Sequence, residues 1–279
     1  MKLHAISDLH LGSPVNRAAL EALAPHRHDW LILAGDIGET EQHLRFALET
    51  LTPRFAQVIW VPGNHDLWTI DPDPWPLKGE YKYRRLVEVC RSFGALTPED
   101  PYVSWPGAEG GQETVIAPMF LLYDYSFRPD HVALEDAVAW ARDGGAVCGD
   151  EGLLEPEPHH TCQAWCERRV LLTERRLADA AADGRRLVLV NHFPLRRDLI
   201  ALERTPRFSI WCGTRATENW HLRFNAEAVV YGHLHLPGSR MLDGVRFEEV
   251  SLGYPGEWDR AAGVGARLRQ ILPAPALAV

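Results

Sequence analysis

Five apolar runs in this sequence are each followed by side chains that can bind a metal ion. The runs are Leu3–Ile6, 30–34, Val58–Val61, Leu187–Val190 and Ala228–Tyr231. In the same order, the side chains that follow are Asp8 and His10, Asp36, Asn64-His65-Asp66, His192, and His233 with His235. Open α/β sheets build their sites at the carboxyl ends of strands, so these groups are expected to converge.

The residue types predict a mixed oxygen and nitrogen metal site. Carboxylates, imidazoles and one carboxamide suit Mn, Fe, Zn or related divalent ions, and no cysteine is among these side chains, as a thiolate-rich structural zinc site would require. The set is too large for one ion, so we expect two ions about 3.5 Å apart that share a carboxylate. Glycines at 35, 63 and 232 are expected to let the backbone turn sharply beside them.

These side chains need a scaffold of alternating strands and helices. Helix-like stretches at 17–23 and 41–51 separate the first three apolar runs, a spacing typical of βαβ units in a largely parallel sheet. The run 115–117 is another expected strand, and 238–242 with 245–250 is expected to form a hairpin around Asp243-Gly244. Further helices are predicted at 132–142 and 162–182.

Residues 67–184 depart from this alternation. The region contains a Pro/Trp-rich stretch at 71–76 and a Pro/Glu loop at 155–158, so we expect one or two sheet elements plus an insertion that covers one end of the sheet. Candidates to contact substrate are Tyr123, Arg196 and Arg197, the arginines through a phosphate group. Trp68 and Trp75 are further candidates, although packing explains them equally well.

The order of the polar blocks resembles the calcineurin-like metallophosphoesterase family. The blocks are Asp8-x-His10, Gly35-Asp36-x-x-Glu39, Gly63-Asn64-His65-Asp66, His192 and Gly232-His233-x-His235. Each block is weak alone, but five in the family's order, each after a strand, are a strong signal. The resemblance implies an α/β fold, a four-layer α/β/β/α sandwich forming a single domain over residues 1–279 with an inserted cap region.

The resemblance also implies roles for individual residues. Asp8, His10 and His235 would bind one metal ion, Asn64, His192 and His233 the other, and Asp36 would bridge the two. A hydroxide between the ions would attack phosphorus in line. His65 would either protonate the leaving oxygen or stabilise charge on the phosphoryl group, and Asp66 would orient His65 through a ring nitrogen. Glu39 stands where many relatives have Asp, and we leave it outside the metal ligands.

The implied activity is metal-dependent hydrolysis of phosphate esters, either monoesters or diesters. The insertion and the block Asn191-His192-Phe193-Pro194 are similar to bacterial phosphopantetheinyl hydrolases, which act on carrier proteins. The expected partner is therefore a small phosphorylated substrate, or a phosphorylated or phosphopantetheinylated protein. A nuclease and a catalytically inactive scaffold of the same fold are the alternatives. An inactive relative should lack ligands, and none is missing here.

The composition restricts the possible classes of substrate and indicates the cellular compartment. A net charge of −9 argues against binding of long polyanions, which makes nucleic acid an unfavourable substrate. Five cysteines, an odd number, are typical of reduced thiols. No apolar run reaches the roughly 18 residues that a membrane span needs, and the first residues do not resemble a signal peptide. We therefore expect a cytoplasmic protein without a membrane partner.

A second metal cluster is conceivable at His159-His160-x-Cys162-x-x-x-Cys166. The two cysteines would share one helix face, but no second ligand pair stands at the spacing of a zinc finger. We favour surface histidines beside a buried helix face.

Overall fold

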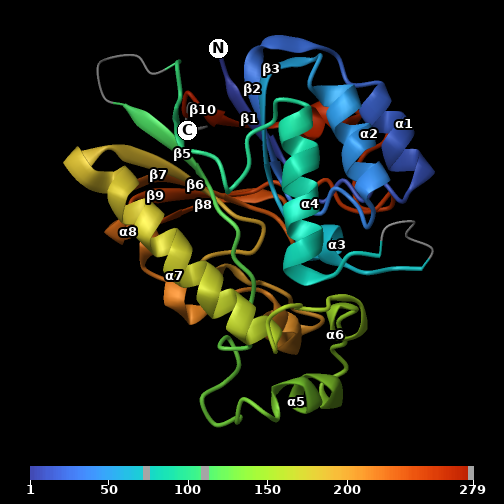
Figure 1. The fold of residues 1–279 in the computed structure, drawn as a ribbon, viewed down its shortest axis with the longest axis vertical. Coiled ribbons are helices and arrows are strands. Elements are labelled where there is room, and N and C mark those ends of the chain that lie inside the picture. Colours follow the sequence, from blue (N-terminus) through green and yellow to red (C-terminus); the bar gives the residue numbers. More distant parts are fainter. Residues whose placement is uncertain (72–75, 108–112, 276–279) are drawn as a thin grey trace.

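Two β-sheets lie face to face in the computed structural model, which describes residues 1–71, 76–107 and 113–275 (Figure 1). The first sheet has the order β10 (Arg269–Leu272), β1 (Leu3–Ile6), β2 (His26–Ala34) and β3 (Phe55–Val61). The second has the order β4 (Val103–Ser104), β5 (Thr114–Pro118), β6 (Arg186–Val190), β7 (Ala226–Tyr231), β9 (Val245–Glu249) and β8 (Gly238–Leu242). β1, β2 and β3 run parallel, as do β5, β6, β7 and β9.

The space between the sheets is filled by one face of each. Leu3 and Ala5 of β1 point into this core, as do Val188 and Val190 of β6, and all four are fully buried. The alternate residues of the same strands, such as Ile6 and Leu189, pack beneath the outer helices. Because both faces of these strands are covered, the strands are apolar throughout, which is why the sequence showed them as continuous runs.

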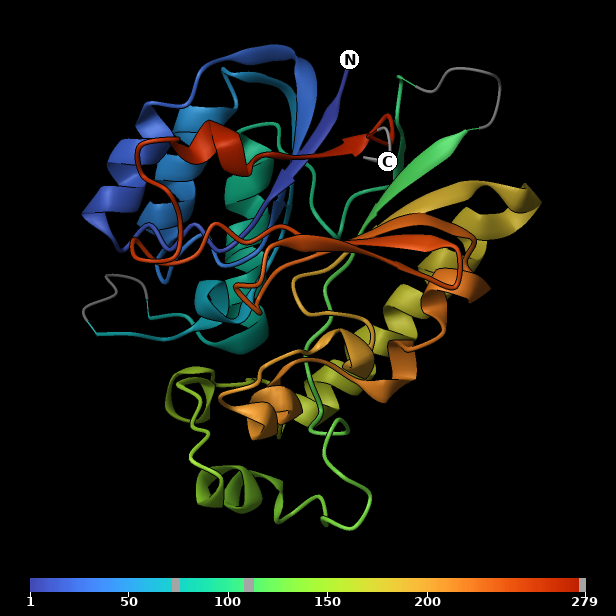
Figure 2. The ribbon, with the colours of Figure 1, turned by 180° about the vertical axis from the view of Figure 1, so that it is seen from behind.

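Helices cover the outer face of each sheet, as the two opposite views show (Figures 1 and 2). α1 (Pro14–Glu21), α2 (Glu41–Leu51) and α4 (Gly79–Ser92) lie on the first sheet, and α7 (Cys162–Ala181) and α8 (Trp220–Arg223) lie on the second. Ser13, Thr40 and Thr161 begin α1, α2 and α7 by accepting a hydrogen bond from the backbone three residues on. The predicted four-layer α/β/β/α sandwich is confirmed.

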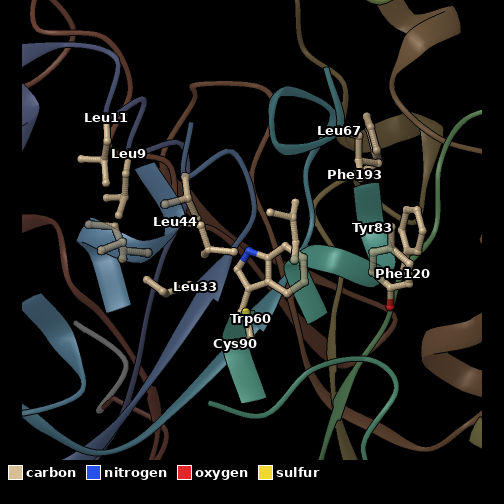
Figure 3. Close-up of a cluster of buried hydrophobic side chains, with 14 of the residues drawn as sticks. Leu9, Leu11, Leu33, Leu44, Trp60, Leu67, Tyr83, Cys90, Phe120 and Phe193 are labelled. Atoms are coloured by element: carbon tan, nitrogen blue, oxygen red, sulfur yellow. The ribbon is translucent and has the colours of Figure 1, made fainter. Parts of the chain in front are cut away.

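A large buried cluster joins the helices to the first sheet. Trp60 of β3 lies in the middle of it, and Tyr83 and Cys90 of α4 contribute side chains (Figure 3). α4 was not predicted, because its residues lie within the region 67–184 that was expected to hold sheet elements and an insertion. The helix buries Tyr83, Leu86, Val87 and Cys90, a helical spacing that the adjacent Pro/Trp-rich stretch obscured.

Two segments at the carboxyl ends of the strands lie outside the four layers. The first, residues 119–161, contains α5 (Ala137–Asp143) and α6 (Asp150–Leu153), which lie at one end of the molecule (Figure 1). The helix predicted at 132–142 therefore begins later, at Ala137, after a series of turns. The second, residues 191–219, contains the short helices η2 (Arg197–Leu199), η3 (Pro206–Trp211) and η4 (Arg215–Thr217) and was not anticipated.

The remaining elements are short. β8 and β9 form the predicted hairpin, with Asp243 and Gly244 at φ of 53° and 79° in the turn. β10 pairs antiparallel with β1 and was not predicted. α3 (Asn64–Leu67), η1 (Ala182–Gly184) and η5 (Val264–Arg267) complete the chain. Among the described residues, no helix is both long enough and apolar enough to cross a bilayer.

Candidate metal centre

The loops after five parallel strands bring the predicted ligands together in two adjoining groups. Asp8, His10 and His235 form one group of possible ligand atoms, and Asp36, His192 and His233 form the other. Asp36 also groups with His10 and His65, so its carboxylate lies between the two. These residues follow β1, β2, β3, β6 and β7, which belong to two different sheets, so the carboxyl ends of strands from both sheets meet here.

In the first group, the nitrogen atoms of two rings face one carboxylate oxygen. His235 Nε2 lies 3.2 Å from Asp8 Oδ1 and 3.2 Å from His10 Nε2. In the second group, His192 Nε2 lies 3.4 Å from Asp36 Oδ2. Burial would lower the pKa of His192, but Asp36 and Asp8 outweigh it and raise the pKa to about 10. The pKa of His235 is raised to about 9, because Asp8 and Glu257 outweigh its burial. Asp8 and Asp36 therefore favour positive charge on these two rings.

Several ligand atoms are buried and have no hydrogen-bond partner in the described part of the chain. They are Asp8 Oδ1, Asn64 Oδ1, His192 Nε2 and His233 Nε2. A buried polar atom left unpaired costs about 1–3 kcal/mol, so four in one place indicate a missing partner. All four are electron-pair donors of the kinds that divalent Mn, Fe and Zn accept. The donor set therefore fits two divalent cations.

Other contacts orient the ligands. His192 Nδ1 lies 2.9 Å from the carbonyl oxygen of Ala34, so Nδ1 donates and Nε2 is the ring nitrogen left to bind a metal ion. His235 Nδ1 is 2.7 Å from Glu257 Oε2. Asp8 Oδ2 accepts from Ser7 Oγ at 2.5 Å and from Ser251 Oγ at 2.7 Å, which leaves Oδ1 to face His235.

The backbone at the centre is strained in a consistent way. Asp8, His10, Asp36, His233 and His235 all have positive φ, between 43° and 72°. Each such residue costs on the order of 1–3 kcal/mol, and such strain is concentrated at functional sites. Gly35 also has a positive φ, 90°, as expected for a sharp turn. Gly63 does not; a Cβ there would instead collide with the Asp36 carboxylate, so its role is to leave room.

Comparison with known proteins agrees with this geometry. A family model described as calcineurin-like phosphoesterase matches residues 1–237. The chain belongs to the calcineurin-like phosphoesterases. It is 49% identical over 275 residues to the [acyl-carrier-protein] phosphodiesterase PptH of Mycobacterium tuberculosis, which covers 98% of this chain and 84% of that protein. The crystal structure of phosphopantetheinyl hydrolase (PptH) from M. tuberculosis superposes with a TM-score of 0.92 at 49% identity, covering 98% of this chain and 96% of that one.

Family membership establishes the class of reaction. Calcineurin-like phosphoesterases hydrolyse phosphate esters with a binuclear metal centre, and this chain is a metal-dependent phosphoesterase of that kind.

Asp66 does not contact the His65 ring as predicted. Its carboxylate accepts hydrogen bonds from four backbone N–H groups, those of Asp36, Ile37, Gly38 and Gly63, at 2.8 to 3.4 Å. It therefore ties the loop after β2 to the loop after β3. The prediction was wrong because adjacency in sequence placed Asp66 next to His65, whereas α3 turns their side chains in different directions.

We expect Asp66→Ala to destabilise the metal-free protein by about 3 kcal/mol, since several buried N–H groups would lose their acceptor. Urea denaturation after chelation would measure this. If Asp66 instead acted chiefly on His65, activity would fall while the free energy of unfolding stayed the same.

Glu39 is the carboxylate that contacts His65. Glu39 Oε1 lies 3.4 Å from His65 Nδ1, and Glu39 Oε2 lies 3.3 Å from His43 Nδ1. Burial alone would lower the pKa of His65, but Asp36 and Glu39 outweigh it and raise the pKa. On its other side the His65 ring stacks on Trp68, with ring centroids 3.6 Å apart. Glu39 and Trp68 therefore hold the ring beside the metal centre.

We expect Glu39→Gln to lower the pKa of His65, because it removes one of the charges that raise it. If His65 must be protonated to act, the high-pH limb of the kcat/KM profile should move to lower pH, with a loss of about 10-fold in kcat at neutral pH. A pH–rate profile of the variant measures both. A limb that moves to higher pH, or not at all, would contradict the assignment.

A cavity of about 490 Å³ opens above the metal centre. Its base contains Asp36, Asn64, His65, His233 and His235. Its walls come from both segments outside the four layers and from the C-terminal loops, namely Trp68, Val147, Cys148, Gly149, Leu202, Thr205, Phe208, Leu234, Tyr254 and Glu257. The walls are largely apolar, and the base is polar.

The three predicted substrate residues do not line this cavity. Tyr123 is 1% exposed and packs against Tyr125 and Phe193 in the core. Arg196 forms ion pairs with Asp198 and Asp243. Arg196 and Arg197 both line a different pocket. These residues were expected at the site because they follow predicted strands, but the turns after β5 and β6 direct their side chains away from the cavity. Trp68 does line the cavity, and Trp75 lies outside the described residues.

Four residues that contribute to the site were missed. Ser251, Tyr254 and Glu257 follow β9, and Tyr254 stacks on His10 with ring centroids 4.3 Å apart. The rule that polar residues follow buried strands would have found this loop, had it been applied to β9. Asp150 belongs to α6, no strand precedes it, and the sequence carried no signal for it.

The cluster His159-His160-x-Cys162-x-x-x-Cys166 has ordinary partners. His159 Nε2 lies 2.9 Å from Glu80 Oε2, and Cys166 is buried. None of these residues belongs to a possible metal group among the residues that the structure describes.

Proposed function

We propose that this phosphoesterase is a phosphodiesterase that releases the phosphopantetheine arm from an acyl carrier protein. The observation that carries the proposal is the 49% identity to the [acyl-carrier-protein] phosphodiesterase PptH over 98% of the chain, together with a TM-score of 0.92 to the phosphopantetheinyl hydrolase structure. Similarity of this extent includes the segments that form the cavity walls, where substrate selection resides.

The shape and lining of the cavity support the same substrate. Phosphopantetheine is a long flexible chain with a phosphate at one end, and it carries methyl groups and amides along its length. The cavity is polar at its base, where Asn64 and His233 lie, and apolar along its walls, where Trp68, Leu202 and Phe208 lie. A phosphate at the base with the arm along the walls satisfies both regions.

We propose Asp8, His10 and His235 as ligands of one metal ion and Asn64, His192 and His233 as ligands of the other, with Asp36 shared. When bound, two divalent ions polarise the phosphoryl oxygens and make water a stronger nucleophile at neutral pH. Mn, Fe and Zn all suit this donor set.

The chain's own residues would complete the reaction. Water adds to phosphorus, the bond from phosphorus to the serine oxygen of the carrier protein breaks, and the serine oxygen takes up a proton. We assign that proton to His65, whose ring lies at the base of the cavity and whose pKa is raised. The products are the apo carrier protein and free phosphopantetheine.

The test is to incubate the metal-loaded enzyme with a holo acyl carrier protein and follow the intact mass of the carrier. We expect the carrier to lose the mass of the complete phosphopantetheine arm, and a chelated sample to leave it intact. A generic phosphate diester serves as a second substrate. Hydrolysis of that diester without any change in the carrier would overturn the carrier-protein assignment while leaving the phosphoesterase class in place.

A cytoplasmic location belongs to the same proposal. All five cysteines are free, which suits a reducing compartment. Nucleic acid remains the less favoured substrate, because the net charge of −9 opposes a polyanion. An inactive scaffold is disfavoured, because the seven proposed ligands are all present.

A further inference from the structure

A buried carboxylate outside the four layers contacts a proposed metal ligand and an aromatic side chain beside the metal centre. Asp150 is the first residue of α6 and is only 2% exposed. Its Oδ1 accepts a hydrogen bond from Asn64 Nδ2 at 2.9 Å and another from Trp68 Nε1 at 2.6 Å. Asn64 is a proposed metal ligand, and Trp68 stacks on His65. One oxygen atom thus connects α6 to two parts of the site.

The contact with Asn64 has a direction that matters for metal binding. A side-chain amide has a donor end and an acceptor end, and only its oxygen can bind a divalent cation. An ionised carboxylate only accepts, so it holds the amide by its nitrogen. The other end of the Asn64 amide, Oδ1, is then turned away from Asp150, and it is one of the buried atoms without a hydrogen-bond partner.

We propose that Asp150 is a positioning residue for the metal centre. It selects the oxygen of Asn64 as a ligand of the ion that His192 and His233 also bind, here called the second ion. It also holds Trp68 against His65. Asp150 lies 86 residues after Asn64, in the segment 119–161 that also supplies cavity wall residues. Affinity for the second ion therefore depends on this segment being correctly folded. The role concerns the metal centre alone and holds whichever phosphate ester is the substrate.

Glu151 provides a matched control. It is the next residue in the chain, and its Oε1 accepts from Tyr125 Oη at 2.5 Å and from Trp211 Nε1 at 2.6 Å. Like Asp150, Glu151 accepts two side-chain hydrogen bonds through one carboxylate oxygen, but Glu151 is exposed and neither of its donors belongs to the metal centre. Both Asp150→Ala and Glu151→Ala therefore remove two hydrogen bonds that tether α6, and only the first should disturb Asn64.

The experiment is calorimetric titration of the metal-free protein with Mn²⁺ alone. For Asp150→Ala we expect one of two binding events to weaken by about 10- to 100-fold, the usual effect of removing a residue that orients a metal ligand, with the other event unchanged. Glu151→Ala should bind both ions as the unmodified protein does. If Asp150→Ala does not fold, Asp150→Asn is measured instead, and a smaller but still selective weakening is expected because one acceptor oxygen remains.

A double mutant tests whether the effect passes through Asn64. If it does, Asn64→Ala combined with Asp150→Ala should bind the second ion no more weakly than Asn64→Ala alone. Full additivity, equal weakening in the Glu151 control, or unchanged affinity in both Asp150 variants would each overturn the proposal. Because no ester is hydrolysed in this measurement, its failure is distinguishable from failure of the proposed function.

Discussion

Asp36→Ala is expected to remove both metal ions and reduce turnover to background. The Asp36 carboxylate belongs to two of the possible ligand groups, with Oδ2 lying 3.4 Å from His192 Nε2 and 3.9 Å from His65 Nε2. Its loss would leave the positions of both ions without their shared negative ligand, so neither would be held tightly. Metal analysis of the purified variant and hydrolysis of a phosphate diester measure the two effects.

Asp36 also makes a structural hydrogen bond, and the effect of losing this bond must be distinguished from the loss of metal binding. Its Oδ1 accepts from the backbone N–H of His65 at 2.9 Å. Asp36→Asn keeps an acceptor for that N–H and should still lose metal, because a neutral amide binds divalent cations more weakly. Asp29→Ala is the control, since Asp29 lies in β2, the strand that precedes Asp36, and has two histidines at 3.4 and 3.6 Å. Equal metal loss from Asp29→Ala would show that the ions bind elsewhere.

His65→Ala is expected to keep both metals and to slow turnover by about 100-fold or more, the scale of a lost general acid. We expect the proposed ligands to remain in place in this variant, because the His65 ring is held by Glu39 and Trp68. Its side-chain contacts with the proposed ligands are with Asp36, 3.9 Å away, and with the His10 ring, 4.7 Å between centroids. The measurement is kcat with metal content determined on the same sample. Turnover at the normal rate would refute any role for His65 in the reaction.

The leaving group decides between the two roles open to His65. A general acid matters less when the leaving oxygen is already a weak base, as in a nitrophenyl ester, than when it is an alkoxide like that of serine. If His65 donates the proton, the defect of His65→Ala should be much smaller on the nitrophenyl ester. An equal defect on both esters would assign His65 to stabilising charge on the phosphoryl group.

Most of the central architecture was predictable from the order of residues. Strands such as β6 and β7 are buried on both faces, so Leu187–Val190 and Ala228–Tyr231 are uniformly apolar and easy to identify. The polar residue after each strand marks the carboxyl end of a parallel sheet. α4 was missed because its helical spacing lies beside a stretch rich in proline and tryptophan, and β10 because its four residues carry no distinct pattern.

Contacts around the ligands could not be predicted in the same way. The sequence placed Asp66 next to His65, yet the ring contacts Glu39, and Asp66 binds four backbone N–H groups instead. A hydrogen bond depends on the direction in which each side chain leaves the backbone, and positive φ at residues such as Asp36 and His233 changes that direction abruptly. Tyr123 was wrong as a substrate residue because its side chain packs in the core, against Tyr125 and Phe193.

The sequence by itself determined the identity and order of the candidate ligands and the alternation of strands and helices, because apolar periodicity and the residues at strand ends are local properties of the chain. The four-layer α/β/β/α arrangement was expected only from the resemblance to the family. The tertiary structure alone decided which atoms of those ligands remain unpaired, which segments wall the cavity, and that a carboxylate from α6 contacts Asn64. Those are relations between residues far apart in the chain, and they exist only once the two sheets have packed and the intervening segments have folded over their edge.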